Sequence, residues 1–144
     1  MALKVISWNA HSLRNKFTEL SILVDKLSID IILISETWFT KDIYFDFPGF
    51  NSYRSDRFRG GVAIFIRSSI PHFAFTKSQF DYAESCSISI YLDNSTVKIS
   101  SIYCSPSATR SQSKAFFESI LSQSGSHVIA GDFNCKNVEW NNFK

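Results

Sequence analysis

Asp30-Ile31-Ile32-Leu33-Ile34-Ser35-Glu36 is a continuous apolar run that is closed by polar residues. Such a run is typical of a strand buried on both faces, the kind that helices cover in α/β folds. Before it, a short apolar stretch from Leu3 to Trp8 leads into a segment whose apolar residues recur at steps of three and four. That spacing predicts a helix from Leu13 to Leu27, with Ser12 as its N-cap. The order strand, helix, strand indicates a crossover unit.

The chain after this run predicts further strands and a second helix. Residues 40–61 contain Pro-Gly and Gly-Gly turn markers and are expected to be irregular, and a buried strand follows at 62–66. Apolar and polar residues alternate over 86–92, which predicts a strand with one buried and one polar face, paired with 97–104 in a hairpin. A helix after Pro106 and a strand at 127–130 complete a single mixed α/β domain over residues 1–144.

The composition indicates a globular chain. Its 144 residues suffice for one domain, and 44% hydrophobic with 19% charged residues argues against disorder. The net charge of +2 gives no strong pointer to nucleic acid. No stretch approaches the ~18 consecutive apolar residues of a membrane span, and no signal peptide is evident. Cys86, Cys104 and Cys135 suggest neither a disulfide framework nor a zinc site, so we expect an intracellular location, nuclear or cytoplasmic, and no membrane association.

Polar residues able to bind a metal or a phosphate lie in or directly after several of the predicted strands. They are Asn9, Glu36, Tyr103, Asp132 and Asn134. Ligand sites of open α/β sheets lie at one end of the strands, so these residues could converge. The carboxylates suit a hard divalent ion such as Mg²⁺, and phosphodiester cleavage depends mainly on positioning and charge neutralisation. Each residue alone could equally be an ordinary polar strand end or a turn former.

Taken in order, four motifs resemble those of the endonuclease/exonuclease/phosphatase superfamily. The motifs are Ile6-Ser7-Trp8-Asn9, Ile34-Ser35-Glu36-Thr37, Ile102-Tyr103-Cys104-Ser105-Pro106 and Gly131-Asp132-Phe133-Asn134. The stretch 57–64 looks like the glycine-bounded strand of the retrotransposon branch, and residues 135–140 resemble jockey-like non-LTR elements. The resemblance implies a four-layer α/β sandwich, in which helices flank two packed mixed β-sheets. It also implies an endonuclease that nicks target DNA with Mg²⁺ (or Mn²⁺), and a covalently linked reverse transcriptase in the full-length element.

The resemblance also implies a role for each residue. Glu36 would be the main metal ligand, and Asn9 would support the metal and the phosphate. Tyr103 would contact the scissile phosphate. Asp132 would orient or deprotonate the attacking water, and Asn134 would bind the phosphate or the transition state.

Three further residues are candidates for substrate binding. His11 stands where many relatives of the superfamily have Asp, and it could bind a phosphate as imidazolium or lie in a surface loop. Arg57 and Arg59 crowd one loop together with Arg54. They could contact DNA phosphates, or they could belong to a solvated surface loop.

The sequence departs from the superfamily at its C-terminal end. Members usually carry a Ser-Asp-His motif there, and this sequence stops at Lys144 without one. We therefore expect an incomplete domain whose closing C-terminal part is missing. Its activity is expected to be impaired, since losing one donor to the transition state typically costs on the order of 10²–10³ in rate. Two alternatives stay open: a catalytically dead retroelement remnant, and a phosphatase of the same superfamily.

Overall fold

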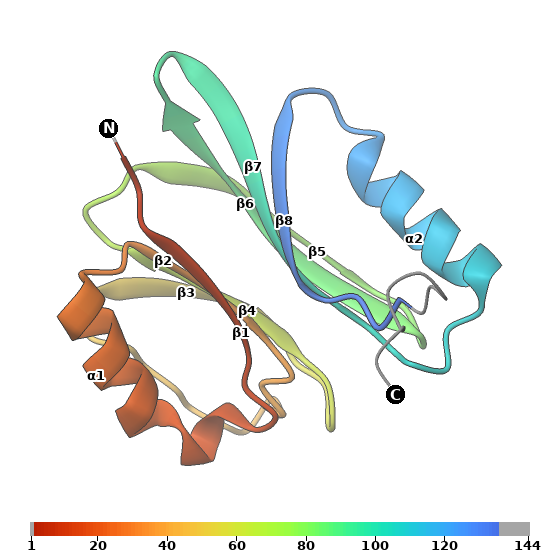
Figure 1. Cartoon of the computed structure of the whole chain (residues 1–144), viewed down its shortest axis with the longest axis horizontal. Coiled ribbons are helices and arrows are strands. Elements are labelled where there is room, and N and C mark those ends of the chain that lie inside the picture. The colour runs from red at the N-terminus through yellow and green to blue at the C-terminus, as the bar shows by residue number, and fades with distance from the viewer. Residues whose placement is uncertain (1, 136–144) are drawn as a thin grey trace, which may run out of the picture.

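The computed structural model describes residues 2–135, which form two four-stranded sheets packed face to face (Figure 1). Sheet A has the order β1-β2-β4-β3, and sheet B has the order β5-β6-β7-β8. The strands are β1 (Val5–Asn9), β2 (Ile31–Ser35), β3 (Phe50–Ser55), β4 (Val62–Arg67), β5 (His72–Gln79), β6 (Ala83–Leu92), β7 (Ser95–Cys104) and β8 (Ser126–Asp132).

The helices cover the outer faces of the two sheets. A short 3-10 helix, η1 (Leu13–Asn15), precedes α1 (Phe17–Leu27), which lies against sheet A, and α2 (Arg110–Leu121) lies against sheet B. Both sheets are mixed: β1 and β2 are parallel, as are β7 and β8, and the other neighbouring strands are antiparallel. The predicted four-layer α/β sandwich is confirmed.

The apolar run of β2 lies at the centre of sheet A, and all five of its residues are buried. Because side chains alternate along a strand, Ile32 and Ile34 pack in the cluster beneath α1, while Ile31 and Leu33 pack between the two sheets. Burial on both faces therefore explains why the run shows no alternation of polar and apolar residues. A third cluster, around Phe116 of α2, fills the space between that helix and sheet B.

Three local predictions were wrong. Residues 40–61 are not wholly irregular, because they contain β3, whose polar composition (FNSYRS) concealed an edge strand that pairs with β4. Ser12 is no cap for a helix that begins at Leu13: its side chain makes no capping hydrogen bond, and α1 begins only at Phe17. The polar face of β6 is not open to solvent, since Ser85 and Ser87 are also buried; α2 covers this side of sheet B.

The other sequence expectations can be compared with the described residues. The hairpin of β6 and β7 is confirmed. Strand β5, by contrast, was not predicted at all. The three cysteines are free thiols, and Cys86 and Cys104 are buried. Among residues 2–135, no helix has the length and hydropathy that a membrane crossing requires. The retroelement-like stretch 135–140 lies outside the described residues from position 136 onward.

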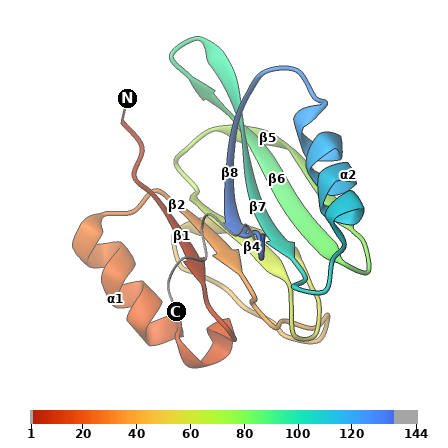
Figure 2. The same cartoon turned by 45° about the vertical axis from the view of Figure 1, so that its right-hand side comes forward.

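The arrangement of the strands brings their carboxyl ends together. Parallel pairing aligns the ends of β1 and β2 in sheet A and those of β7 and β8 in sheet B. The two pairs face each other across the sandwich, with β1 and β2 in contact with β8, and β2 in contact with β7. Figure 2 shows β1 and β8 descending side by side toward the same end of the molecule. This end holds the polar residues that follow the strands.

Candidate active site

Three polar side chains from separate strand ends meet, and the amide nitrogen of one of them contacts the carboxylates of the other two. Asn9 Nδ2 donates a hydrogen bond of 2.8 Å to Glu36 Oε1 and one of 2.9 Å to Asp132 Oδ2. Asn9 ends β1, Glu36 follows β2, and Asp132 ends β8, so the cluster joins both sheets. The structure thus brings together three of the residues that the sequence selected.

His11 lies beside the same carboxylate. Its Nδ1 is 3.0 Å from Glu36 Oε2, and its backbone N–H donates to Asn9 Oδ1 at 3.1 Å. The imidazole packs edge-on against the Trp38 indole, with ring centroids 4.4 Å apart. The His11 side chain is 69% exposed, so the ring can meet a ligand from solvent.

The surroundings of Glu36 favour its charged form. Burial alone would raise the pKa of this carboxyl, but hydrogen bonds from Asn9 and His11, the adjacent Trp38 indole N–H and the charge of His11 lower the pKa below its usual value. The Trp38 indole N–H is buried beside the carboxylate without reaching normal hydrogen-bond geometry to any described residue. Glu36 is therefore a carboxylate at neutral pH, as a metal ligand must be.

The backbone of Glu36 is strained and is held from two sides. Its φ is +54° and that of Trp38 is +56°, in the left-handed region that costs a non-glycine residue about 1–3 kcal/mol. On one side, the carbonyls of Ser35, Glu36 and Thr37 accept from the N–H groups of Ala10, Ser12 and Leu13 at 2.9, 2.9 and 3.1 Å. On the other, Thr37 N–H donates to Gly61 O (3.2 Å) and Trp38 N–H donates to Gly60 O (2.8 Å). The two flanking segments thus fix where the carboxylate lies.

Tyr103 occupies the row of sheet B that includes Asp132. It pairs with Asp132 of β8 on one side and with Glu84 of β6 on the other, so the three side chains share the face toward sheet A. Burial raises the pKa of the Tyr103 phenol, and the charges of Glu36, Asp132 and Glu84 raise it further, whereas Arg57 lowers it. The phenol therefore stays protonated at neutral pH and can donate a hydrogen bond to an anion.

Asn134 lies directly after this row and is tied to it. Its backbone N–H donates to Asp132 Oδ1 at 3.1 Å, and its side-chain Nδ2 donates to Cys104 O at 2.8 Å. Both carboxylate oxygens of Asp132 are thus hydrogen-bonded, since Asn9 occupies the other one. These contacts orient Asp132 toward Glu36.

The sequence did not select Glu84, which the structure places next to Tyr103. Its side chain is fully buried, accepts a hydrogen bond from Gly61 N–H, and lies 2.9 Å from Arg57 Nε as an ion pair. Burial raises the pKa of Glu84, and this effect outweighs the opposing influence of Gly61 and Arg57. A single acidic residue within the apolar and serine-rich strand 83–92 was the sequence signal that could have revealed it.

The three loop arginines have different surroundings. Arg57 uses its remaining nitrogens to donate to the carbonyls of Phe80 and Asp81. Arg54 lies in β3, pairs with Asp56 at 2.8 Å and donates to Ile43 O. Arg59 is exposed, with its guanidinium 5.6 Å from the centre of the Phe58 ring. Arg57 and Arg54 therefore hold backbone segments together, while Arg59 faces solvent.

The donor atoms of the cluster fit a divalent cation with a preference for oxygen. Glu36 and Asp132 present carboxylates on either side of one amide nitrogen. Within residues 2–135, no group of three or more His, Cys, Asp and Glu side chains is arranged as a metal cage. Mg²⁺ usually binds through one or two carboxylates and keeps its remaining positions for water and substrate phosphate. The arrangement therefore fits Mg²⁺ or Mn²⁺ better than a structural zinc ion, which needs four protein ligands.

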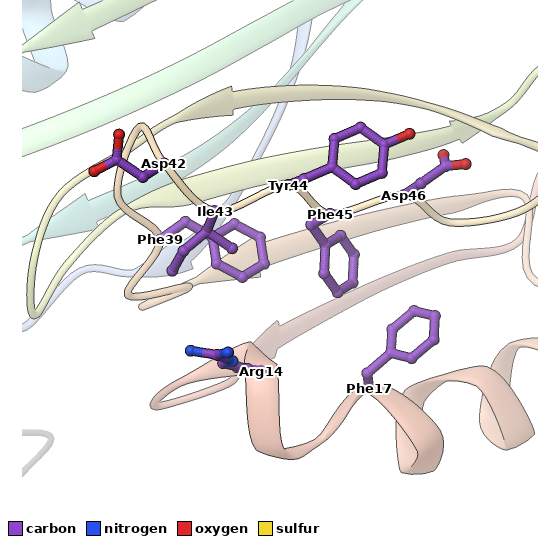
Figure 3. A pocket seen from close by; sticks show the side chains of 8 residues that line it. All are labelled: Arg14, Phe17, Phe39, Asp42, Ile43, Tyr44, Phe45 and Asp46. Carbon is purple, nitrogen blue, oxygen red and sulfur yellow. The ribbon is translucent and has the colours of Figure 1, made fainter.

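A pocket lined by other residues is a separate feature (Figure 3). It lies between the start of the first helical segment and the loop after β2, and its lining includes Arg14, Phe17, Phe39, Asp42 and Asp46. It contains none of the residues of the Asn9–Glu36–Asp132 cluster. Its lining carries two acidic side chains and one basic one, so its charge does not favour an anion.

Comparisons with known proteins agree on one family. Residues 6–143 match the family model described as the endonuclease/exonuclease/phosphatase family. The chain is 25% identical over 96% of its length to a probable RNA-directed DNA polymerase from transposon BS of Drosophila melanogaster. It is 28% identical over 97% of its length to the RNA-directed DNA polymerase from the mobile element jockey of the same species. The chain spans 16% of the length of each of these relatives.

Solved structures share the fold. The endonuclease domain of TRAS1, a telomere-specific non-LTR retrotransposon, has a TM-score of 0.70 and 18% identity, with 96% of this chain and 63% of that chain covered. The catalytic domain of Xenopus laevis APE2 has a TM-score of 0.71 and 24% identity, with 94% of this chain and 59% of that chain covered. The matched part is therefore about three-fifths of each of these two chains.

Proposed function

The chain belongs to the endonuclease/exonuclease/phosphatase family, and from this premise we propose that it is a Mg²⁺-dependent endonuclease domain of a non-LTR retrotransposon that nicks target DNA. One amide nitrogen, Asn9 Nδ2, carries this proposal, because it brings Glu36 and Asp132 together at the aligned ends of strands from both sheets. Two carboxylates at such a point can bind a divalent cation and the attacking water of a phosphodiester hydrolysis.

Each residue of the cluster has a role in the proposed reaction. Glu36 holds the cation, which when bound neutralises phosphate charge and polarises the phosphoryl group. Asn9 fixes the spacing between Glu36 and Asp132. Asp132 orients the attacking water and accepts its proton, while Asn9 and Asn134 hold the two carboxylate oxygens in place.

The donors around this carboxylate pair bind the phosphate. Tyr103 stays protonated because of its raised pKa, so its O–H can donate to a phosphate oxygen. Asn134 lies beside Asp132; its Nδ2 donates one hydrogen to Cys104 O, and the second hydrogen would donate to the phosphate or the transition state. In its imidazolium form, His11 can donate to a phosphate through Nε2 while its Nδ1–H donates to the Glu36 carboxylate.

The proposed substrate and partner follow from the relatives. Those matched over nearly the whole chain are named as polymerases of mobile elements, and the TRAS1 structure is named as a retrotransposon endonuclease domain. We infer that DNA is the substrate, and that a reverse transcriptase is covalently linked in the full-length element. An intracellular location, nuclear or cytoplasmic, belongs to the same proposal.

Nicking of supercoiled plasmid by the purified chain tests the proposal. The assay compares wild type, Glu36→Ala and Asp132→Ala in Mg²⁺ and in EDTA, and Asp25→Ala, an exposed carboxylate on α1, serves as the matched control. We expect Mg²⁺-dependent nicking by wild type and the control, and a loss on the order of 10²–10³ or more in each of the two site variants.

Other results would point to the alternatives. A folded wild-type chain that binds DNA without any Mg²⁺ dependence and does not nick it would identify a catalytically dead remnant. Release of phosphate from inositol phosphates without plasmid cleavage would identify a phosphatase.

A further inference from the structure

We propose that Glu84 is a positioning residue for Glu36, acting through the Gly60–Gly61 turn. This inference rests on the proposed function, in which Glu36 holds the cation. Glu84 touches neither substrate nor cation in this role, because its carboxylate is fully buried between the sheets. Glu84 instead fixes the Gly60–Gly61 turn, and this turn fixes the backbone next to Glu36.

Glu84 binds the turn directly. Its Oε1 accepts the backbone N–H of Gly61, and its Oε2 pairs with Arg57 Nε at 2.9 Å. Arg57 is itself anchored by donating to the carbonyls of Phe80 and Asp81, immediately before β6. The β3–β4 turn is therefore attached to sheet B through a side chain of β6, although its own strands belong to sheet A.

The turn transmits this attachment to the segment that carries the metal ligand. Gly61 O accepts from Thr37 N–H, and Gly60 O accepts from Trp38 N–H, in the two residues that follow Glu36. The approach is so close that a Cβ at Gly61, whose φ is +88°, would overlap Thr37 Oγ1. A Cβ at Gly60 would lie only 2.7 Å from Glu84 Oε1. Two glycines therefore permit a contact in which any movement of the turn moves Thr37 and Trp38.

The strained backbone of Glu36 makes this support necessary. A left-handed glutamate persists only where surrounding contacts overdetermine its conformation. The segment 10–13 supplies one side of that support and the Gly60–Gly61 turn supplies the other. Removing the Glu84 carboxylate, which accepts the Gly61 N–H, would therefore weaken the support that the Gly60–Gly61 turn supplies.

A contribution to the stability of the fold does not by itself explain why a glutamate is buried at position 84. A buried ion pair often contributes no more than apolar residues of similar volume, because both charges lose their hydration. The raised pKa of Glu84 reflects that cost. What an apolar residue could not do is accept the Gly61 N–H, so the contact that distinguishes Glu84 is the one that reaches the Glu36 segment.

Amide hydrogen exchange and Mn²⁺ affinity, measured on the whole chain, test this role. Glu84→Ala removes the acceptor, and Glu84→Asp keeps the charge but withdraws it by one methylene, so it provides the same test if the alanine variant fails to fold. Glu84→Gln retains an acceptor oxygen. Ser87→Ala is the control, because it removes a buried hydrogen bond to Ser100 on the opposite face of the same strand.

We expect about tenfold faster exchange of the Thr37 and Trp38 amides in Glu84→Ala or Glu84→Asp, with unchanged exchange in the core of sheet B. Mn²⁺ affinity is expected to fall about tenfold in the same variants, the size of effect typical for residues that support a metal ligand. Glu84→Gln is expected to lie closer to wild type. Wild-type exchange at both amides in a folded Glu84→Ala or Glu84→Asp variant, or equal acceleration in Ser87→Ala, would overturn the proposal.

The exchange measurement is independent of the proposed function. A wild-type chain that neither binds Mn²⁺ nor nicks DNA would contradict the endonuclease proposal. The exchange rates of Thr37 and Trp38 would still decide whether Glu84 holds the Glu36 segment.

Discussion

Asn9 and Asp132 are 123 residues apart in the chain, and their side chains are joined by a hydrogen bond of 2.9 Å. The bond links the end of β1 in sheet A to the end of β8 in sheet B. The same amide nitrogen also donates to Glu36, so its two hydrogens separate two carboxylates that would otherwise repel each other. Asn9 is thus a structural link between the sheets as well as part of the candidate site.

Replacing Asn9 by Asp is expected to destabilise the metal-free chain. Three carboxylates would then face one another, and both hydrogen bonds from the amide would be lost. We expect the free energy of unfolding at pH 7 in EDTA to fall by about 1–3 kcal/mol. Repulsion raises the pKa values of the folded carboxyls, so the deficit should shrink as the pH falls toward 4.

Urea denaturation at several pH values measures this effect. Asn9→Leu is the matched control, because it removes the amide without adding a charge, and its deficit should vary less with pH. An Asn9→Asp chain as stable as wild type at pH 7 would show that the amide does not separate the carboxylates.

Two substitutions of Glu36 distinguish backbone strain from the loss of the carboxylate. Both Glu36→Gly and Glu36→Ala remove the side chain, so both are expected to lose Mg²⁺-dependent nicking. Because φ at this position is +54°, glycine should be more stable than alanine by about 1–2 kcal/mol. Chemical denaturation of the two variants, side by side, gives the difference, and equal stabilities would mean that the position is not strained.

The raised pKa of Glu84 predicts a pH dependence of stability. The buried carboxyl holds its proton more tightly than in the unfolded chain. Its protonated form therefore contributes fully to the free energy of unfolding at pH values below the usual pKa of 4.5, and this contribution is lost as the pH rises through the folded pKa. Glu84→Gln cannot ionise. The stability advantage of wild type over this variant should therefore decrease from pH 4.5 upward, as measured by thermal or urea unfolding in EDTA. An advantage that grows with pH would contradict the raised pKa.

The loop arginines should separate into two classes. Arg59→Ala is expected to weaken DNA binding and to lower the salt slope of the affinity by about one, because an exposed guanidinium that contacts a phosphate releases about one counterion. Arg57→Ala should instead reduce stability by roughly 2 kcal/mol, less than for a fully buried pair because its side chain is 23% exposed.

Fluorescence anisotropy at several salt concentrations and urea denaturation provide the two measurements. Equal losses of DNA affinity and of stability in both variants would remove the distinction. A loss of salt-dependent DNA binding in Arg57→Ala alone would assign the phosphate contact to Arg57 instead of Arg59.

The sequence predicts the layers of this fold because its central strands are strongly patterned. The run 31–35 and the hairpin of 86–92 with 97–104 were recognisable from the pattern of apolar residues in the sequence alone. The edge strands were not. In β3 only Phe50 and Ser55 are buried, and β5 is largely exposed, so neither carries the apolar pattern from which strands are recognised. Their strand structure comes from pairing with β4 and β6, which is a tertiary effect.

The same contrast holds for the site. Asn9, Glu36 and Asp132 were predictable because each follows a recognisable strand and matches a family motif. Glu84 was not, because its function as an acceptor for Gly61 depends on a contact, between residues 23 positions apart, that joins sheet B to the β3–β4 turn of sheet A. Nothing in the single sequence indicated that Arg57 would form an ion pair with Glu84 instead of facing solvent.

The division of the candidate site between two sheets has a consequence for inactivation. Each sheet is held by its own ladder of backbone hydrogen bonds, whereas the layer between them is mostly apolar and is fixed by side-chain contacts such as the hydrogen bond from Asn9 to Asp132. A shear of about 1 Å between the layers would misalign Glu36 and Asp132 enough to cost roughly 10²-fold in rate while leaving every strand intact. Mild heat or a smaller side chain at Ile64 in that core is therefore expected to lower the rate of the proposed nicking about 10²-fold before any secondary structure is lost.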